Sequence, residues 1–564
     1  MSRRRLLPLL PALTMLALLG PVLAGLWGTV LPAFGHLPAA GLTGPSLDPF
    51  RDLLGWAGLP RAVMLSVGTG VLATVMSLAI VMLVTAGWSG TRVFGVLERL
   101  LSPLLAVPHA AAAFGLAFLI APSGWLARLT SPELTGWDRP PDLLIVQDSW
   151  GLAMTAGLIV KEVPFLLLIT LAALGQADAQ RSVRVARALG YGRLTGWLKT
   201  VFPRVYAQIR PPVYVVLAYA MSVVDVAVIL GPNTPPSLSV QIVKLMAHPD
   251  LSHRLEAAAG AVLQLLLVIG ALLVWRLGEG AVAALGRRWI AAGARGKADP
   301  VIAGLALVAG AVSALAVFLG LVVLGVWSVA GFWGFPDALP DKITMANWLR
   351  FGPGTLQALC ETAFIAVVAA LVALVLTIGC LEAEYRHKLR VSQRALWVLY
   401  IPLLVPQTAF LPGLQTLMLN LGAEVGRGPV ILAHVVFVLP YVFLSLADPF
   451  RAWDARMGVI AAALRASPDG ILWRVRLPML LRPVLTAFAV GLAVSVGQYL
   501  ATLLIGGGRV ATLTTEAVAL ASGGDRRAIG VYGLMQTGAA LVPFALALLI
   551  PALVWRNRKG LRHG

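Results

Sequence analysis

Four polar side chains lie inside apolar stretches of the chain, where an isolated charge is energetically costly. They are Lys161, Glu162, Asp225 and Gln498. Ionisable groups at membrane depth usually line a transport path or pair with one another. These residues therefore predict either the lining or gate of a path for a polar solute, or a buried structural pair such as Lys161 with Asp225. The same groups would serve a proton- or ion-driven transporter, so they leave the energy source open.

Patterns for catalysis or metal binding do not accompany these residues. Cys360 and Cys380 are the only cysteines and lie 20 residues apart in one apolar run; this is roughly 30 Å along a helix, too far for a disulfide. His109 and His434 are single histidines in apolar runs, where packing or a helix–helix hydrogen bond is a simpler role than a metal site. The pattern H-E-x-x-H is absent, so we disfavour a membrane-embedded enzyme.

Two basic segments share a motif and a spacing. Residues 184–190 read RVARALG and precede Pro203, while residues 459–465 read VIAAALR and precede Pro478. Each copy has an Ala-x-Ala-Leu core, and 13 positions separate the residue after this core from the proline. Ordinary cytoplasmic loops would explain the positive charge, but not the repeated core at a fixed interval. We therefore expect both segments to form short helices that dock on a soluble partner.

Basic and aromatic side chains of these segments are the expected contacts to that partner. The basic residues are Arg184, Arg187, Arg193 and Lys199 in the first segment and Arg474, Arg476 and Arg482 in the second. The aromatic residues, Trp197 and Trp473, are expected to anchor the interface.

The composition is that of a membrane protein. Hydrophobic residues make up 59% of the 564 residues and charged residues 12%, against about 25% charged residues in soluble domains. The net charge of +19 fits an excess of Lys and Arg on cytoplasmic loops, and no basic patch interleaved with aromatic residues points to nucleic acid. Runs long enough to span a bilayer lie near 6–30, 62–88, 100–121, 150–174, 211–231, 257–275, 301–329, 356–381, 395–418, 429–448, 483–505 and 529–555.

These runs predict an all-α polytopic membrane protein with about twelve transmembrane helices in two homologous halves of six. The first half covers residues 1–275 with a docking loop at 175–210, and the second covers 301–564 with a docking loop at 449–482. A basic cytoplasmic linker is expected at 276–300.

Both chain termini are expected in the cytoplasm, because this orientation places most Lys and Arg residues in cytoplasmic segments, where membrane proteins carry an excess of them. The N-terminal run follows Arg3, Arg4 and Arg5, and we expect it to be retained as a span rather than cleaved as a signal peptide. The repeat extends beyond the docking loops. Pro108 precedes Gly115 by seven residues, as Pro406 precedes Gly413, which indicates a pseudo-twofold assembly with a path between the halves.

The two docking loops resemble those of the membrane subunits of binding-protein-dependent ABC importers. The layout is most similar to the fused two-half permeases of the thiamine and ferric-iron type. That family's loop carries Glu-Ala-Ala, a glycine four residues after the last Ala, and a distal Leu-Pro. The matching residues are Ala186, Gly190, Pro203, Ala461, Leu477 and Pro478, whereas Arg184 and Val459 replace the family's Glu and Arg465 replaces the second glycine.

The resemblance implies a permease subunit of the bacterial inner membrane that binds no cofactor itself. No phosphate-loop pattern is present, so ATP would be hydrolysed by two copies of a separate cytoplasmic ATPase, one on each docking loop. The outside loops 122–149 and 506–528 would receive a periplasmic solute-binding protein. Thiamine-like solutes, ferric iron and sulfate-like oxyanions are all compatible with the family, and a proton- or ion-coupled secondary transporter is the alternative function.

Overall fold

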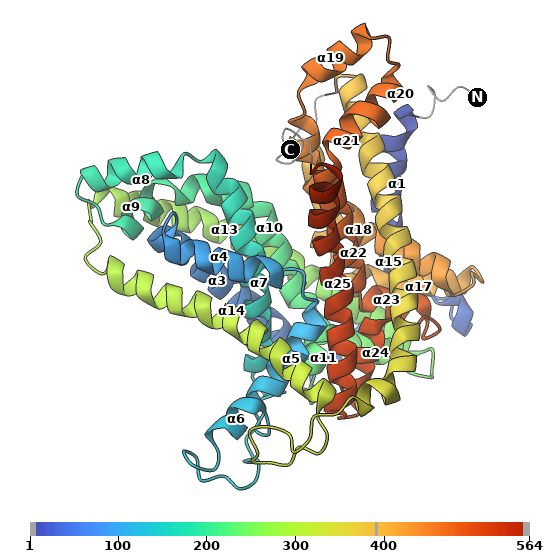
Figure 1. The fold of residues 1–564 in the computed structure, drawn as a ribbon. Coiled ribbons are helices and arrows are strands. Elements are labelled where there is room, and N and C mark those ends of the chain that lie inside the picture. The colour runs from blue at the N-terminus through green and yellow to red at the C-terminus, as the bar shows by residue number, and fades with distance from the viewer. Residues whose placement is uncertain (1–6, 390–392, 557–564) are drawn as a thin grey trace.

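The computed structural model of the protein describes residues 7–389 and 393–556, and it consists mainly of helices (Figure 1). The first part of the chain contains α1 (Leu10–Ala33), α2 (Asp48–Gly55), α3 (Leu59–Trp88), α4 (Arg92–Leu104), α5 (His109–Ile120), α6 (Trp125–Thr130), α7 (Leu152–Gln176), α8 (Ala179–Ala188), α9 (Arg193–Thr200), α10 (Phe202–Ser222), α11 (Asp225–Leu230), α12 (Leu238–Met246) and α13 (His253–Ala291). The second part contains α14 (Asp299–Val329), α15 (Ala346–Arg386), α16 (Gln393–Leu404), α17 (Gln407–Asn420), α18 (Arg427–Arg451), α19 (Ala455–Ala463), α20 (Pro468–Ile471), α21 (Leu477–Met479), α22 (Leu481–Val496), α23 (Leu500–Gly506), α24 (Leu513–Leu520) and α25 (Arg526–Val554). Short elements are η2 (Leu7–Leu9), η3 (Pro38–Ala40) and the π-helical η4 (Leu472–Arg476).

The number of helices that could cross a membrane is smaller than the twelve predicted. In the described ranges, nine helices are long and apolar enough, or up to eleven if each of two sharply bent helix pairs counts as one span. The expected run 211–231 is divided between α10 and α11. Arg210, Pro211 and Pro212 lie inside α10, and α11 has six residues, so neither is counted. The basic residues expected at the N-terminus, Arg3 to Arg5, lie outside the described ranges.

Most of the segment 276–300, expected as a linker between two halves, is helical. Instead of a loop over 276–300, α13 continues as a helix to Ala291 and α14 begins at Asp299. Only residues 292–298 connect the two helices without helical structure. The Gly- and Ala-rich composition that indicated a linker is also compatible with a helix, since alanine is the strongest helix former.

The helices that begin the two predicted halves, α1 and α14, each pack extensively against the other predicted half. α1 packs along α17 and α15 of the second half, and in Figure 1 it lies among the yellow and orange helices of that half. The hydroxyl of Thr29 donates to the carbonyl oxygen of Ala409 at 2.7 Å. A Cβ atom on Gly25 would meet the Phe410 carbonyl, and one on Gly413 would meet the backbone of α1. Glycine is required at this crossing because the two backbones touch.

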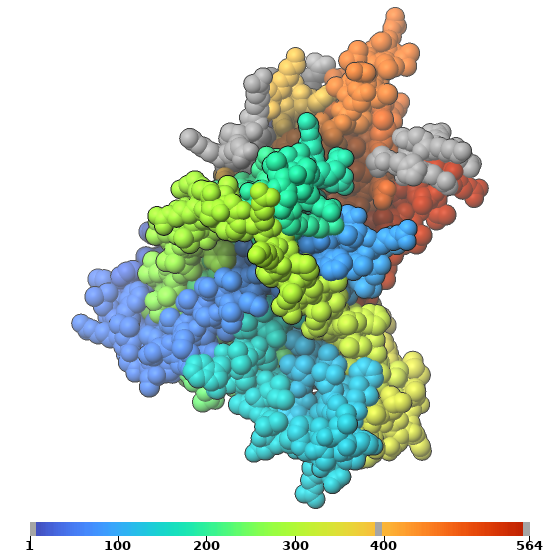
Figure 2. Space-filling view, turned by 90° about the vertical axis from the view of Figure 1, so that its left-hand side faces the viewer, coloured from blue at the N-terminus to red at the C-terminus, as the bar shows by residue number. Residues whose placement is uncertain are grey.

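The reciprocal packing places α14 on the first predicted half. This helix packs against α3, α4 and α5 of the first half and also against α25 of its own half, and Figure 2 shows it in yellow-green across the blue surface of the first half. A Cβ atom on Gly115 of α5 would lie 2.7 Å from the carbonyl carbon of Gly320 in α14. Gly115 and Gly413, which the sequence paired as repeats, therefore both mark a close crossing with one of these two helices.

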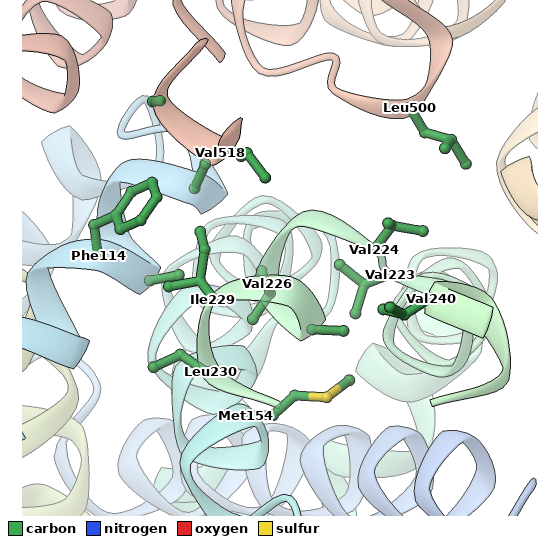
Figure 3. Packing of buried hydrophobic residues seen from close by; sticks show 14 of the residues in the cluster. Phe114, Met154, Val223, Val224, Val226, Ile229, Leu230, Val240, Leu500 and Val518 are labelled. Carbon is green, nitrogen blue, oxygen red and sulfur yellow. The ribbon is translucent and has the colours of Figure 1, made fainter. Parts of the chain in front are cut away.

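The largest hydrophobic cluster joins the two halves. It contains Phe114 of α5 and Ile229 of α11 together with Val518 of α24, and Figure 3 shows these three side chains facing one another. Between helices in a bilayer such side chains stabilise the fold through van der Waals packing, because the lipid tails are as apolar as the side chains. The halves thus share one core instead of meeting at a separate polar interface.

Arginines of the predicted outside loops also join the halves. Arg128 of α6 is 4% exposed and donates to the carbonyl oxygens of Ser123 at 3.0 Å and Asp337 at 3.2 Å. Arg526 of α25 donates to the Ser123 hydroxyl at 2.6 Å. Sequence reasoning placed both arginines on a surface for a binding protein, and for Arg128 this was wrong because carbonyl groups of the other half cover it.

Candidate transport cavity and docking loops

Four helix breaks meet at one cavity between the halves. They separate α4 from α5, α10 from α11, α16 from α17 and α22 from α23. The cavity has a volume of about 260 Å³ and a wall built from both halves. Pro108 and Pro406 precede α5 and α17, and a proline disfavours helical backbone at the residue before it. Figure 3 shows Val224 at one break and Leu500 at another.

All four polar residues selected from the sequence line this cavity. Lys161 and Glu162 come from α7, Asp225 is the first residue of α11, and Gln498 lies in the break between α22 and α23. Residues more than 300 positions apart in the chain are thus brought to one wall.

The side chain of Lys161 is tied to the end of α4. Its ammonium group donates to the carbonyl oxygens of Val107 at 2.6 Å, Leu104 at 3.0 Å and Leu105 at 3.4 Å. Leu105 and Val107 follow the end of α4, where carbonyl groups lack a donor within the helix, and the Leu104 carbonyl also accepts from the N–H group of Val107 at 3.3 Å. The suggested pair of Lys161 with Asp225 is not formed, and in the described part of the chain Asp225 makes no ion pair within 4.0 Å.

Glu162 points to His109, for which the sequence left packing and a helix–helix hydrogen bond open. The Glu162 Oε1 atom lies 3.6 Å from Nε2 of His109, whose ring also contacts the ring of Tyr219 at 4.9 Å between centroids. Both rings line the cavity. The signal that could have identified His109 is its position directly after the repeated Pro108, where the helix is broken.

The second half contributes amides and aromatic rings to the wall. The Gln407 side chain donates to Oε1 of Gln498 at 3.5 Å. Tyr441, Phe437 and Tyr499 also line the cavity. Gln407 was missed, although it follows Pro406 as His109 follows Pro108.

His434 holds the helix break that carries Gln498. Its Nδ1 atom lies 2.7 Å from the Ser495 hydroxyl in α22, and its Nε2 atom lies 2.9 Å from the Thr502 hydroxyl in α23. The predicted helix–helix hydrogen bond is confirmed. Because one ring contacts both sides of the break, it fixes their relative orientation.

The first docking loop consists of α8, α9 and the turn between them. The N–H group of Gly190 donates to the Arg187 carbonyl at 2.9 Å, and that of Tyr191 donates to the Ala186 carbonyl at 3.1 Å. This is the pattern that ends a helix with one left-handed residue, and Gly190 has a φ of +83°. Ala186 is buried, whereas Arg184 and Arg187 are exposed.

The second docking loop, α19 to α21, repeats this geometry. The N–H group of Arg465 donates to the Ala462 carbonyl at 2.9 Å, and that of Ala466 donates to the Ala461 carbonyl at 3.0 Å. Arg465 has a φ of +63°, and Ala461 is buried like its counterpart in the first loop. Arg465 therefore occupies the left-handed position that Gly190 occupies in the first copy.

Replacing Arg465 by glycine is expected to stabilise the protein by about 1 kcal/mol. The left-handed backbone costs a side-chain-bearing residue about 1–2 kcal/mol, and the added chain entropy of glycine offsets about 0.4–1 kcal/mol of this gain. Thermal unfolding in detergent measures the effect. The control is Ala466→Gly, one position later and without a positive φ, which should lower the melting temperature. A lower melting temperature for Arg465→Gly would contradict the assignment.

The distal prolines of the motif both begin helices. Pro203 lies in the first turn of α10 and Pro478 follows Leu477 at the start of α21, positions where the missing N–H group of proline costs nothing. In both copies the spacing of 13 residues thus runs from a left-handed helix end to a proline in the first turn of a later helix.

The exposed apolar side chains of the two docking loops lie at equivalent positions. Leu189 is 61% and Leu464 is 79% exposed, and Val185 and Ile460 are 55% and 56% exposed. An exposed group of apolar side chains usually marks an interaction surface. Sequence reasoning named the arginines of this surface and missed these residues, although the leucine belongs to the repeated Ala-x-Ala-Leu core.

Three of the expected contacts to a partner, Trp197, Lys199 and Arg476, are buried inside the chain. The Lys199 ammonium group donates to the carbonyl oxygens of Trp289 at 3.1 Å and Ala294 at 2.9 Å, so its predicted contact to a partner was wrong. Trp197 is fully buried, so its predicted role as an interface anchor was wrong, whereas Trp473 is 67% exposed. Arg476 is 2% exposed and pairs with Glu382 at 2.7 Å. Its predicted role in steering a partner was therefore wrong as well, and burial lowers its pKa.

Asp299, the first residue of α14, caps the first docking loop. The Oδ2 atom of Asp299 accepts from the N–H group of Thr195 at 2.8 Å, and its Oδ1 atom accepts from the Thr195 hydroxyl at 2.6 Å. Gly192 stands at the N-cap of α9 without a side chain, and a Cβ atom there would collide with the Asp299 carboxylate. In the second loop Ser467, 275 residues after Gly192, caps α20 through Gly470.

Replacing Asp299 by alanine is expected to destabilise α9 by about 1 kcal/mol, the usual cost of losing a helix cap. Amide hydrogen exchange of residues 193–200 should rise roughly fivefold in consequence. The matched control is Ser467→Ala, which should raise exchange in the second docking loop and leave α9 unchanged. Equal exchange of α9 in wild type and Asp299→Ala would show that the cap from α14 is not used.

Comparisons with known proteins give a consistent family. Residues 375–555 match the family model described as binding-protein-dependent transport system inner membrane component. The chain is 32% identical over 550 residues to the inner membrane ABC transporter permease protein YnjC of Escherichia coli (strain K12), covering 95% of this chain and 98% of that protein. It is 29% identical over 164 residues to the spermidine/putrescine transport system permease protein PotC of Haemophilus influenzae, covering 28% of this chain and 64% of that protein. It is also 40% identical over 80 residues to the molybdenum transport system permease protein ModB of Mycobacterium bovis, covering 14% of this chain and 30% of that protein.

Proposed function

Because this chain belongs to the inner-membrane permeases of binding-protein-dependent ABC transport systems, we propose that it forms the whole path of an importer for a small polar solute. The observation that carries this proposal is the cavity at four helix breaks, whose wall is built from both halves. ATP is hydrolysed by a separate subunit in this family. Ion-driven secondary transporters are a different class, so family membership argues against that alternative.

The proposed architecture is two fused half-permeases, 1–275 and 301–564, with twelve spans and both termini in the cytoplasm. The equivalent docking loops and the reciprocal packing of α1 and α14 support two related halves. In this arrangement α10 with α11 is the twelfth span, broken at the cavity. Surrounding helices and the cavity satisfy the backbone groups of such a broken span.

The proposed partners are two copies of a cytoplasmic ABC ATPase and one periplasmic solute-binding protein. Each ATPase copy would seat one docking loop, with contacts by Leu189 and Arg184 in the first and by Leu464 in the second. The binding protein would deliver solute at the opposite end of the molecule, where α6 lies (Figure 1). ATP-driven closure of the ATPases would then rock the halves about the cavity.

Reconstitution with its ATPase tests this function. The full-length chain, co-expressed with candidate ABC ATPases, should purify with two ATPase copies per permease. In lipid nanodiscs, ATP hydrolysis should rise when the loaded binding protein is added. A permease that purifies without an ATPase, and whose vesicles take up solute when a pH gradient is imposed, would refute the proposal.

A further inference from the structure

The acidic and basic side chains of the cavity wall all come from the first half. They are His109, Lys161, Glu162 and Asp225. We infer that this cavity selects a small organic cation. This inference rests on the proposed role of the cavity as the solute path. The inference follows from which of these charges remain available to a solute.

Lys161 has no hydrogen-bond donor left for an anion. An ammonium group has three donors, and three carbonyl oxygens at the end of α4 accept from it at 2.6, 3.0 and 3.4 Å. An oxyanion in the cavity would therefore have to displace these bonds to reach its cation. The ammonium group of Lys161 is thus hydrogen-bonded to backbone carbonyl groups and has no donor available to a solute.

The two carboxylates of the wall, Glu162 and Asp225, have fewer partners than Lys161 has. Glu162 has one partner, His109, at 3.6 Å, and Asp225 makes no ion pair within 4.0 Å among the described residues. With both carboxylates ionised and His109 neutral, the wall carries one net negative charge even when Lys161 is counted. Helix dipoles do not reverse this sign, because every break joins the negative end of one helix to the positive end of the next.

Aromatic rings complete the wall and favour an organic cation over a bare ion. Six of them line the cavity: Phe165, Tyr219, Phe437, Tyr441, Tyr499 and Phe544. The face of an aromatic ring attracts ammonium-type cations and packs against their carbon substituents. The first half thus supplies the negative charge and both halves supply rings.

Charge-selective thiol labelling tests this inference on the full-length permease in nanodiscs, without ATPase. In a background with Cys360→Ala and Cys380→Ala, the variant Gln498→Cys places a thiol in the wall. Its reaction rate is measured with the trimethylammonium-ethyl and sulfonato-ethyl methanethiosulfonates, which differ mainly in charge. The variant Leu134→Cys, at an exposed site outside the cavity, provides the reference ratio of the two rates.

We expect the ratio of cationic to anionic labelling rates at Gln498→Cys to exceed the reference ratio by at least about tenfold. Adding Asp225→Asn should remove most of this preference, as the loss of one unit charge a few ångströms away predicts. Glu162→Gln, which removes the other carboxylate charge, is the second neutral variant, and the same ratio of labelling rates is measured on it. A ratio at or below the reference, or one that neither neutral variant lowers, would overturn the inference.

The organic character of the cation has its own readout. Tetramethylammonium chloride should slow labelling of Gln498→Cys more than sodium chloride at the same concentration, and equal protection would refute this part. Because labelling needs no ATPase, its failure leaves the proposed importer function intact, and failure of ATPase co-purification leaves the labelling result valid.

Discussion

Replacing Leu189 and Leu464 together by aspartate is expected to abolish co-purification with the ATPase and all ATP hydrolysis that depends on the permease. Both side chains are largely exposed at equivalent helix ends, so the chain should fold normally. Loss of a central interface anchor typically costs about 2 kcal/mol or more, which is roughly a thirtyfold loss of affinity for each loop. Pull-down and ATPase rates in nanodiscs measure the effect.

The single variants should differ, because the two docking loops have different chemistry. The first presents Arg184 and Arg187 beside Leu189, whereas the second presents Val459 where the first has Arg184. Leu464→Asp should therefore be more damaging than Leu189→Asp, and reversing both arginines to glutamate should weaken the first contact most at low salt.

The control for this experiment is Leu134→Asp, an exposed leucine in the loop after α6. It should leave ATPase association unchanged. Normal co-purification of the Leu189→Asp and Leu464→Asp double variant would show that the ATPase docks elsewhere.

Replacing Glu382 by alanine is expected to destabilise the second half by about 3–5 kcal/mol, the usual cost of leaving one member of a buried ion pair alone. The partner, Arg476, is 2% exposed and lies over the rings of Tyr385, Trp453 and Phe450 at 3.6, 4.2 and 4.7 Å. Glu382 also pairs with Arg386 at 2.6 Å. The melting temperature in detergent and hydrogen exchange of the second docking loop measure the loss.

A neighbouring ion pair provides the matched control. Glu384 pairs with Arg451 at 2.9 Å in a more exposed setting, so Glu384→Ala should cost at most about 1 kcal/mol. The double variant Glu382→Leu with Arg476→Leu should recover part of the stability, because no unpaired charge then remains. Equal losses for Glu382→Ala and Glu384→Ala would contradict the structural role of the buried arginine.

The sequence by itself determined the features that depend on short stretches of chain. Apolar runs predict helices in a membrane, because a bilayer requires every backbone group to be satisfied within the helix. The repeated core and interval identified both docking loops, including Arg465 in the place of Gly190, since a helix end is a local structure. The cost of charges in apolar runs identified Lys161, Glu162 and Asp225 one by one.

Only the tertiary structure decided which residues meet. The packing of α1 and α14 against the other predicted half cannot be read from local patterns, because it depends on backbone contact between helices far apart in the chain, as at Gly115 and Gly320. A basic residue in a loop looks exposed in sequence, yet Arg476 is buried by aromatic rings from two other helices. Exposure is a property of the neighbours, and the partners of Lys161 followed from where α4 ends in space rather than from its own position in α7.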